Sequence, residues 1–184
     1  MRRLLFVLAL LLSAGCDSDG SLLGEFVGRT TVDATTERVE GEAVYTVVDG
    51  AYGPEFVLGL FVGDLFESDF DAYDYVLFRR PGGRPGVGAY AVDADPVTAV
   101  AATIARVDDA DDPLESAGVV LTGTSGTLAV TRVDDFGFVA GTYRFEAEGL
   151  RVDVPGVRAT GAASGTFEAR YAPPSTFRRL GLDL

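Results

Sequence analysis

Hydrophobic and polar residues alternate with a period of two over most of the chain that follows residue 23. Such alternation is typical of β-strands that bury one face. Gly, Pro and Asp interrupt it about every ten residues, which is the spacing of turns between short strands. We therefore predict one antiparallel all-β domain over residues 24–184, a β-sandwich or a barrel of about ten strands.

Three stretches add detail to this prediction. The alternating stretch 39–48 runs into Asp49-Gly50, which is a strong hairpin signal. The near-continuous apolar run 56–62 is compatible with a strand buried on both faces. Residues 97–107 contain alanines that favour a helix, but the β-branched residues toward the end of the stretch favour a strand, which we predict.

Three segments in the last third of the chain contain Gly-Thr, at Gly126, Gly141 and Gly165, and each continues as alternation. We expect each glycine to lie at the start of a strand, where it allows a bulge or a tight turn. In the second and third segments one face is expected to point inward, and the arginines and carboxylates of the other face are expected to pair across strands. The inward set is Tyr143, Phe145, Ala147, Phe167, Ala169 and Tyr171, and the outward set is Arg144, Glu146, Glu148, Thr166, Glu168 and Arg170.

The first fifteen residues are arranged like a secretory signal peptide. Arg2 and Arg3 form a positive start, an apolar run of nine residues follows at 4–12, and the small residues 13–15 suit a peptidase site. The apolar run is too short to cross a bilayer, which takes about 20 residues. We therefore expect residues 1–15 to be a signal peptide that directs the chain out of the cytoplasm.

The single cysteine, Cys16, directly follows this signal. The stretch LSAGC resembles the lipobox of bacterial lipoproteins. The resemblance implies cleavage between Gly15 and Cys16 and acylation of Cys16, so that residues 16–23 form a lipidated cysteine and a short tether. Two or three acyl chains suffice for stable membrane anchoring. The alternative is an ordinary secreted protein in which Cys16 lies at the cleavage site by chance.

The Gly-Thr segments carry a second resemblance. Their alternating apolar positions, and a last segment that ends in Tyr171, are similar to a family of uncharacterised bacterial lipoproteins of Bacteroidetes type, over residues 118–171. That family has no known activity or catalytic residue, so the resemblance implies no chemistry. The expected location is the cell envelope, with the membrane contacted through N-terminal acyl chains. Asp17 resembles an inner-membrane retention signal in one group of bacteria and a surface-export signal in others. The sequence therefore does not decide between the inner and the outer membrane.

Composition excludes several classes of function. The formal net charge is −13, and loss of Arg2 and Arg3 with the signal takes it to −15. Such an acidic chain opposes binding to nucleic acid and to anionic headgroups. The sequence has no His and no Lys, and its one thiol would be acylated, so the usual zinc, copper and haem sites, Ser-His-Asp triads and Schiff bases are excluded. We expect no enzyme activity, no metal and no cofactor.

Three groups of residues are candidates for binding. The acidic cluster Asp108, Asp109, Asp111 and Asp112 precedes Pro113, and we interpret it as a solvated turn in preference to a calcium site. Glu146 and Glu148 are interpreted as an exposed strand face in preference to a catalytic pair. The segment 61–78 mixes aromatic and acidic residues, and we expect core packing there, although it is the first place to look for a ligand surface. Its members are Phe61, Asp64, Phe66, Glu67, Asp69, Phe70, Asp71, Tyr73, Asp74, Tyr75 and Phe78.

Three functions are consistent with these observations. The leading hypothesis is a membrane-anchored envelope lipoprotein that acts as a non-catalytic binding or structural module, whose envelope protein or glycan partner is unknown. The second is a lipocalin-like carrier of a small apolar ligand, which requires a central cavity. The third is a carboxylate-dependent hydrolase, which requires two acids about 5–9 Å apart across a cleft.

The lipidation hypothesis predicts the mass of the mature N-terminus. Cells that produce the full chain should yield a protein that begins at Cys16 and carries acyl chains, and globomycin, which inhibits the lipoprotein signal peptidase, should cause a form that retains residues 1–15 to accumulate. Mass spectrometry of the N-terminal peptide measures both. A purified native protein that keeps its leader, or that has an unmodified Cys16 thiol, would contradict the hypothesis.

Overall fold

The computed structural model describes residues 23–51, 53–62, 73–93, 99–107, 117–135, 137–152, 154, 156–179, 182 and 184. Within these ranges the chain forms nine strands and one short helix. They are β1 (Gly24–Val32), β2 (Thr35–Gly50), β3 (Gly53–Val62), β4 (Tyr73–Pro81), β5 (Gly88–Val92), β6 (Ala101–Val107), β7 (Ala117–Val133), β8 (Phe138–Arg151), β9 (Arg158–Tyr171) and α1 (Pro174–Arg179). In the same ranges no helix has the length and apolar character needed to cross a membrane.

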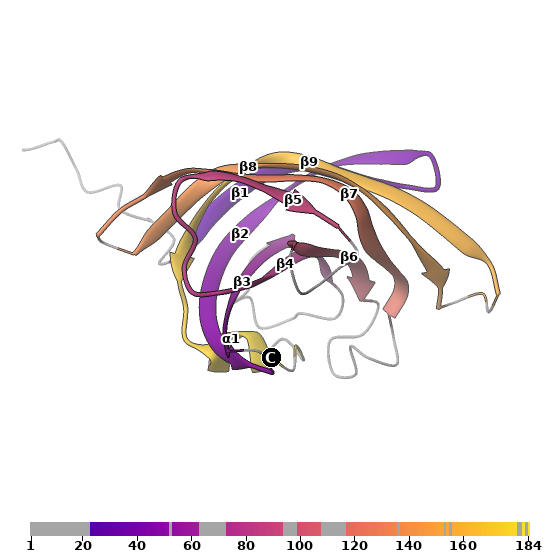
Figure 1. The fold of residues 1–184 in the computed structure, drawn as a ribbon. Helices are drawn as coiled ribbons and strands as arrows, with labels where there is room; N and C mark the ends of the chain where they lie inside the picture. The colour runs from indigo at the N-terminus through magenta and orange to yellow at the C-terminus, as the bar shows by residue number, and fades with distance from the viewer. Residues whose placement is uncertain are drawn as a thin grey trace, which may run out of the picture.

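Eight of the strands close into an antiparallel barrel (Figure 1). The order around the ring is β7, β6, β4, β3, β2, β1, β9 and β8, and the ladder between β8 and β7 closes it. The ninth strand, β5, pairs with the second half of β7, beyond the point where β6 ends its pairing. The all-β prediction is therefore confirmed, and the choice between sandwich and barrel is decided for the barrel.

β7 bends where its partner on one side changes from β6 to β5. The register with β8 shifts between Gly123 and Ser125, and Gly126 has a φ of 150°, a conformation that side chains disfavour. A Cβ at Gly126 would also lie 2.3 Å from the carbonyl oxygen of Arg144. The expected bulge is thus present at the first Gly-Thr segment. The expectation that these glycines begin strands is wrong, because Gly126, Gly141 and Gly165 all lie inside long strands.

The interior of the barrel is filled by aromatic rings over part of its length. Phe78 of β4 meets Tyr143 and Phe145 of β8 across the interior, with ring centroids 5.6 and 5.5 Å apart and tilted edge contacts. Tyr143 lies over Gly28 and Gly165, where a Cβ would approach its hydroxyl oxygen to 2.3 and 2.7 Å. The two glycines are opposite each other in the β1–β9 ladder, so together they make the space that the phenol ring occupies.

A second apolar layer covers the outer face of β2, β3 and β4. β3 is buried on both faces, as the apolar run predicted: Phe56, Leu58 and Leu60 join the interior, while Val57 and Phe61 point outward. Phe177 of α1 packs on Phe61 with ring centroids 6.1 Å apart, and Figure 1 shows α1 and the C-terminus beside this part of the barrel. The short helix therefore explains why this stretch of sequence carries no polar face.

The hairpins follow the predicted positions with two differences. Asp49 and Gly50 form the last pairs of β2, and the turn lies one step later, between Gly50 and Gly53. The β1–β2 turn has a positive φ at both Asp33 (47°) and Ala34 (72°), the conformation of a two-residue type I′ turn. Residues 33–34 lack the Gly that usually marks this turn, so the alternation pattern alone did not reveal it.

The predicted faces of β8 and β9 are confirmed over most of their length. The side chains of the inward set through Ala169 are buried, and the neighbouring residues of β8 are exposed. On the outward side, Arg132 of β7 pairs with Glu168 at 2.6 Å, reaching across β8. Tyr171 is the exception: it contacts the Tyr45 ring at the end of the strand, but 56% of it is exposed.

The packing of Tyr143 generates a double-mutant prediction. Gly28→Ala should destabilise the fold by about 1–3 kcal/mol, because the new methyl group overpacks the phenol. Tyr143→Phe removes a buried hydroxyl that has no hydrogen-bond partner among the described residues, so it should cost nothing or stabilise by about 1 kcal/mol. Combined with Gly28→Ala, it should recover part of the loss. Denaturant unfolding of the four proteins measures the coupling, and strictly additive effects would contradict this packing.

Candidate functional site

A cavity of about 350 Å³ opens at one end of the barrel. Its walls come from seven strands, β1, β2, β3, β4, β6, β7 and β8, and mostly from their inward positions. The apolar part of the wall includes Phe26, Val32, Val39, Val62, Val76, Ile104 and Val119. Apart from Phe26, the phenylalanines and tyrosines of the barrel interior do not line this cavity. Smaller aliphatic side chains take the inward positions here and leave space that aromatic rings would fill.

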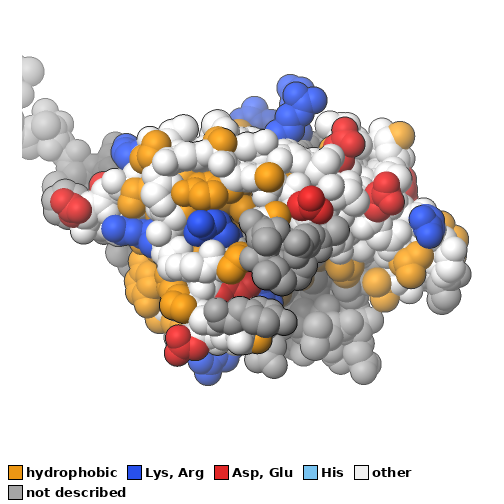
Figure 2. All heavy atoms as spheres, in the orientation of Figure 1, with side chains coloured by type: hydrophobic (Ala, Val, Ile, Leu, Met, Phe, Trp, Pro, Cys, Tyr) orange, Lys and Arg blue, Asp and Glu red, His pale blue; other side chains and the backbone are white. Residues whose placement is uncertain are grey.

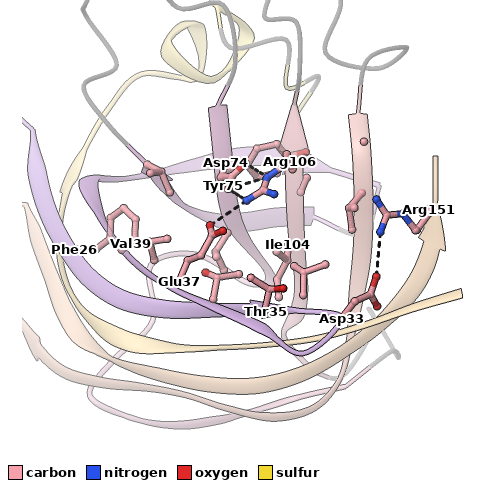
Figure 3. Close-up of a pocket in the computed structure, with 17 residues that line it drawn as sticks. Phe26, Asp33, Thr35, Glu37, Val39, Asp74, Tyr75, Ile104, Arg106 and Arg151 are labelled. Atoms are coloured by element: carbon pink, nitrogen blue, oxygen red, sulfur yellow. Dashed lines mark hydrogen bonds and ion pairs between the residues drawn. The ribbon is translucent and has the colours of Figure 1, made fainter. Parts of the chain in front are cut away.

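Charged side chains line the outer part of the cavity (Figure 3). Arg106 of β6 and Asp74 of β4 are opposite each other in the ladder, and the guanidinium donates two hydrogen bonds to the carboxylate, from Nε at 3.0 Å and from Nη2 at 2.9 Å. The same Nη2 donates to Glu37 of β2 at 3.2 Å. One guanidinium therefore joins carboxylates from two separate strands across the mouth.

The electrostatics of Arg106 follow from this geometry. The hydrogen bond to Asp74 and the charge of its carboxylate, with a smaller effect of Glu37, raise the pKa of Arg106 above its ordinary value, although partial burial acts the other way. The guanidinium is thus a permanent cation whose donors are directed at carboxylates. Its side chain is still 48% exposed, so water screens these interactions and their effect on stability is modest.

The charged lining residues, Asp33, Glu37, Asp74, Arg106 and Arg151, form the rim of the cavity. A second ion pair lies elsewhere on this rim. Arg151, the last residue of β8, donates to Asp33 at 3.3 Å. Asp33 lies at the tip of the β1–β2 hairpin, and its other carboxylate oxygen accepts the backbone N–H of Thr160 in β9 at 3.2 Å. The backbone N–H of Asp33 donates to the Thr160 carbonyl at 3.0 Å. These bonds fasten the hairpin tip to β9, and Figure 3 shows the pair well apart from Arg106.

The residues proposed from the sequence fall in different places. Cys16 and the acidic cluster Asp108, Asp109, Asp111 and Asp112 lie outside the described residues. Glu146 and Glu148 are exposed on the outer face of β8, where the solvated interpretation placed them. They line a shallow groove there and do not face the barrel cavity.

The described parts of the segment 61–78, residues 61–62 and 73–78, contribute both to packing and to the cavity, while the candidates Asp64, Phe66, Glu67, Asp69, Phe70 and Asp71 lie outside the described residues. Phe61 and Phe78 are fully buried, as expected, and the Tyr75 ring lies 6.1 Å from that of Phe61 in the outer layer, where burial raises the pKa of the phenol. Asp74 and Tyr75 both line the cavity. With Val62 and Val76, four residues of this segment therefore line the cavity, and the remaining lining residues come from other parts of the chain.

Four charged residues of the rim were not identified from the sequence: Asp33, Glu37, Arg106 and Arg151. A signal for two of them exists. Glu37 continues the inward row of β2 two residues before Val39, and Arg106 continues that of β6 two residues after Ile104. Extending each inward row to the end of its strand would have found them. Asp33 and Arg151 depend on how the hairpins bend, and no local pattern shows that.

A metal site would need several ligating side chains close together in the described part of the chain. No three His, Cys, Asp or Glu side chains there come together as a metal site would require. Figure 2 shows arginine and acidic side chains distributed over the same face with apolar side chains between them, without an extended basic surface in that view. Compared with protein-family models, with curated proteins and with solved structures, the chain matches none.

The shared guanidinium generates a prediction about stability and salt. Arg106→Met should destabilise the protein by about 1 kcal/mol or less in low salt, because Glu37 and Asp74 lose the cation between them. The loss should shrink in about 1 M NaCl, because salt screens the repulsion between the two carboxylates. Urea unfolding at both salt concentrations measures it. Arg38→Met, which breaks a more exposed pair with Glu40 (side chains 73% and 67% exposed), is the matched control and should show a smaller salt effect.

Proposed function

We propose that the protein is a lipid-anchored binding module of the cell envelope whose barrel takes a small, mainly apolar ligand at its open end. One observation carries the proposal: a cavity that is apolar in its depth and polar at its rim, formed by strands of a closed barrel. Concave, mostly apolar sites with a few polar groups are typical of small-molecule binding, and the mouth of a barrel is a common place for them.

The size of the cavity limits the ligand. A water-sized group takes about 30 Å³ in a liquid, so about 350 Å³ holds roughly a dozen non-hydrogen atoms. A ligand of that size typically binds with a Kd on the order of 0.1 mM unless its fit is unusually good. The barrel is therefore suited to a short amphiphile or a small ring system and too small for a complete lipid.

The anchoring part of the proposal rests on the LSAGC stretch and on Cys16. β1 begins at Gly24, directly after the tether, and runs to Val32 in the cavity wall. Nine residues of strand span about 30 Å, so the start of β1, which follows the tether in sequence, lies at the opposite end of this strand from the rim. An anchored barrel would then open toward the aqueous space, and its ligand would enter from water.

Binding is testable at a single atom, because Ile104 is the one isoleucine of the sequence and lies in the cavity wall. In protein labelled at isoleucine δ1-methyl groups, octanol should shift the one signal in a saturable manner, with a Kd on the order of 0.1 mM. Val39→Phe should weaken binding at least about fivefold by filling the cavity, with Thr30→Phe as a second filling variant in case the first is unstable.

Val27→Phe is the matched control for these variants. Val27 lies on β1 next to the cavity residue Phe26, but it points outward and is 44% exposed. This substitution adds a ring to the outer surface and should leave octanol binding unchanged. The proposal is contradicted if octanol leaves the Ile104 methyl signal in place, or if the inward and outward variants bind octanol equally well.

A further inference from the structure

The charges around the cavity do not balance. Three carboxylates, those of Asp33, Glu37 and Asp74, line it together with two guanidinium groups, those of Arg106 and Arg151. One negative charge is therefore left over at the rim.

The arginines of the rim are already engaged. Arg106 directs its Nε and Nη2 donors to Asp74 and shares Nη2 with Glu37, while Arg151 donates to Asp33. Among the described residues, the bonds of Arg106 use Nε and Nη2, so an incoming carboxylate could accept from Nη1 but would lie close to Asp74 and Glu37. A third negative charge beside one guanidinium adds repulsion that offsets the new charge-assisted bond.

A cation or a hydroxyl meets the opposite situation. Glu37 accepts one hydrogen bond from Nη2 of Arg106, at 3.2 Å, and its side chain is 52% exposed. Its carboxylate can therefore accept further hydrogen bonds at the mouth of the cavity. An ammonium group can approach it without breaking the Arg106–Asp74 pair. An uncharged hydroxyl can donate a hydrogen bond to Glu37 or accept one from Arg106, and it meets no charge repulsion there.

We infer that the cavity selects amphiphiles by the charge of their polar end, binding cationic and uncharged short-chain ligands in preference to anionic ones. The inference rests on the proposed function, because it assigns a ligand class to the same cavity. The apolar chain would lie against Val39, Val76 and Ile104, and the polar end would lie beside Glu37. At least a tenfold preference for an ammonium over a carboxylate is expected, because the Glu37 carboxylate attracts the ammonium and repels the carboxylate at a distance of a few ångströms.

The test compares octylammonium, octanol and octanoate, which share one apolar chain. Each is titrated below its aggregation concentration while the Ile104 methyl signal is followed. Octylammonium should bind at least about tenfold more tightly than octanoate, with octanol between them or equal to octylammonium. The ratio should fall as salt is raised, because the rim charges are partly exposed and screened.

Variants connect the selectivity to the rim. Glu37→Gln should lower the octylammonium-to-octanoate ratio at least about threefold, and Asp74→Asn should act in the same direction if Glu37→Gln is unstable. Glu40→Gln removes one carboxylate from the exposed outer face of the same strand and should leave the ratio unchanged. This control separates the rim from the overall charge of the protein.

The outcomes separate the two proposals. If none of the three ligands shifts the methyl signal, the cavity does not bind such molecules and the proposed function fails. If octanoate binds as tightly as octylammonium, or if Glu40→Gln changes the ratio as much as Glu37→Gln, the charge inference is overturned while the binding function stands.

Discussion

The ladder between β7 and β8 closes the sheet, and nearly every other feature depends on that closure. The ladder runs from Val119 to Val133 on β7 and is long enough to continue through the bulge at Gly123. Without it, β7 and β8 would each present an open edge, which is a template for unwanted pairing. With it, alternate side chains of eight strands are directed into one space, and their volumes decide whether that space is filled or hollow.

The interior is filled at one level and open at another because bulky and small residues are unevenly placed. β9 supplies Ala159, Ala163 and Gly165 to the interior, and the rings of Tyr143 and Phe145 pack against this flat wall. Nearer the rim the inward positions hold aliphatic residues such as Val76 and Val119, which do not meet across the barrel. Close packing and a cavity thus arise from the same alternation, through a change in side-chain size along the strands.

Much of the fold could be predicted from local pattern, while the arrangement of the strands could not. A period of two identifies strands and their faces, and the run 56–62 even indicated a strand covered on both sides. The cover itself, α1, has six residues, too few for a helical period to appear. The order of the strands depends on contacts between distant segments, such as β1 with β9, and no local pattern encodes those.

The candidate site was harder to predict for a related reason. Alternation predicts which face of the sheet a residue lies on, but not its position along the barrel axis. The cavity is formed by residues at one position along that axis, so alternation does not locate it. Asp74 was noticed because aromatic and acidic residues crowd around it in sequence. The sequence around Glu37 and Arg106 shows no such crowding. The two side chains meet only because the fold brings β2, β4 and β6 to the same level of the barrel.

The charged side chains at the rim have two effects: they pair with one another at the end of the barrel, and they set the electrostatic environment of the cavity mouth. Inward positions at the end of a barrel strand are close to water and to one another, so they must be polar and their charges must be paired. Asp74 and Arg106 meet this need as a cross-strand pair, each two residues from an aliphatic neighbour in its own inward row, Val76 and Ile104. The position at which each row changes from aliphatic to charged therefore sets the depth of the cavity and, at the same time, the electrostatic environment that a ligand's polar end would meet.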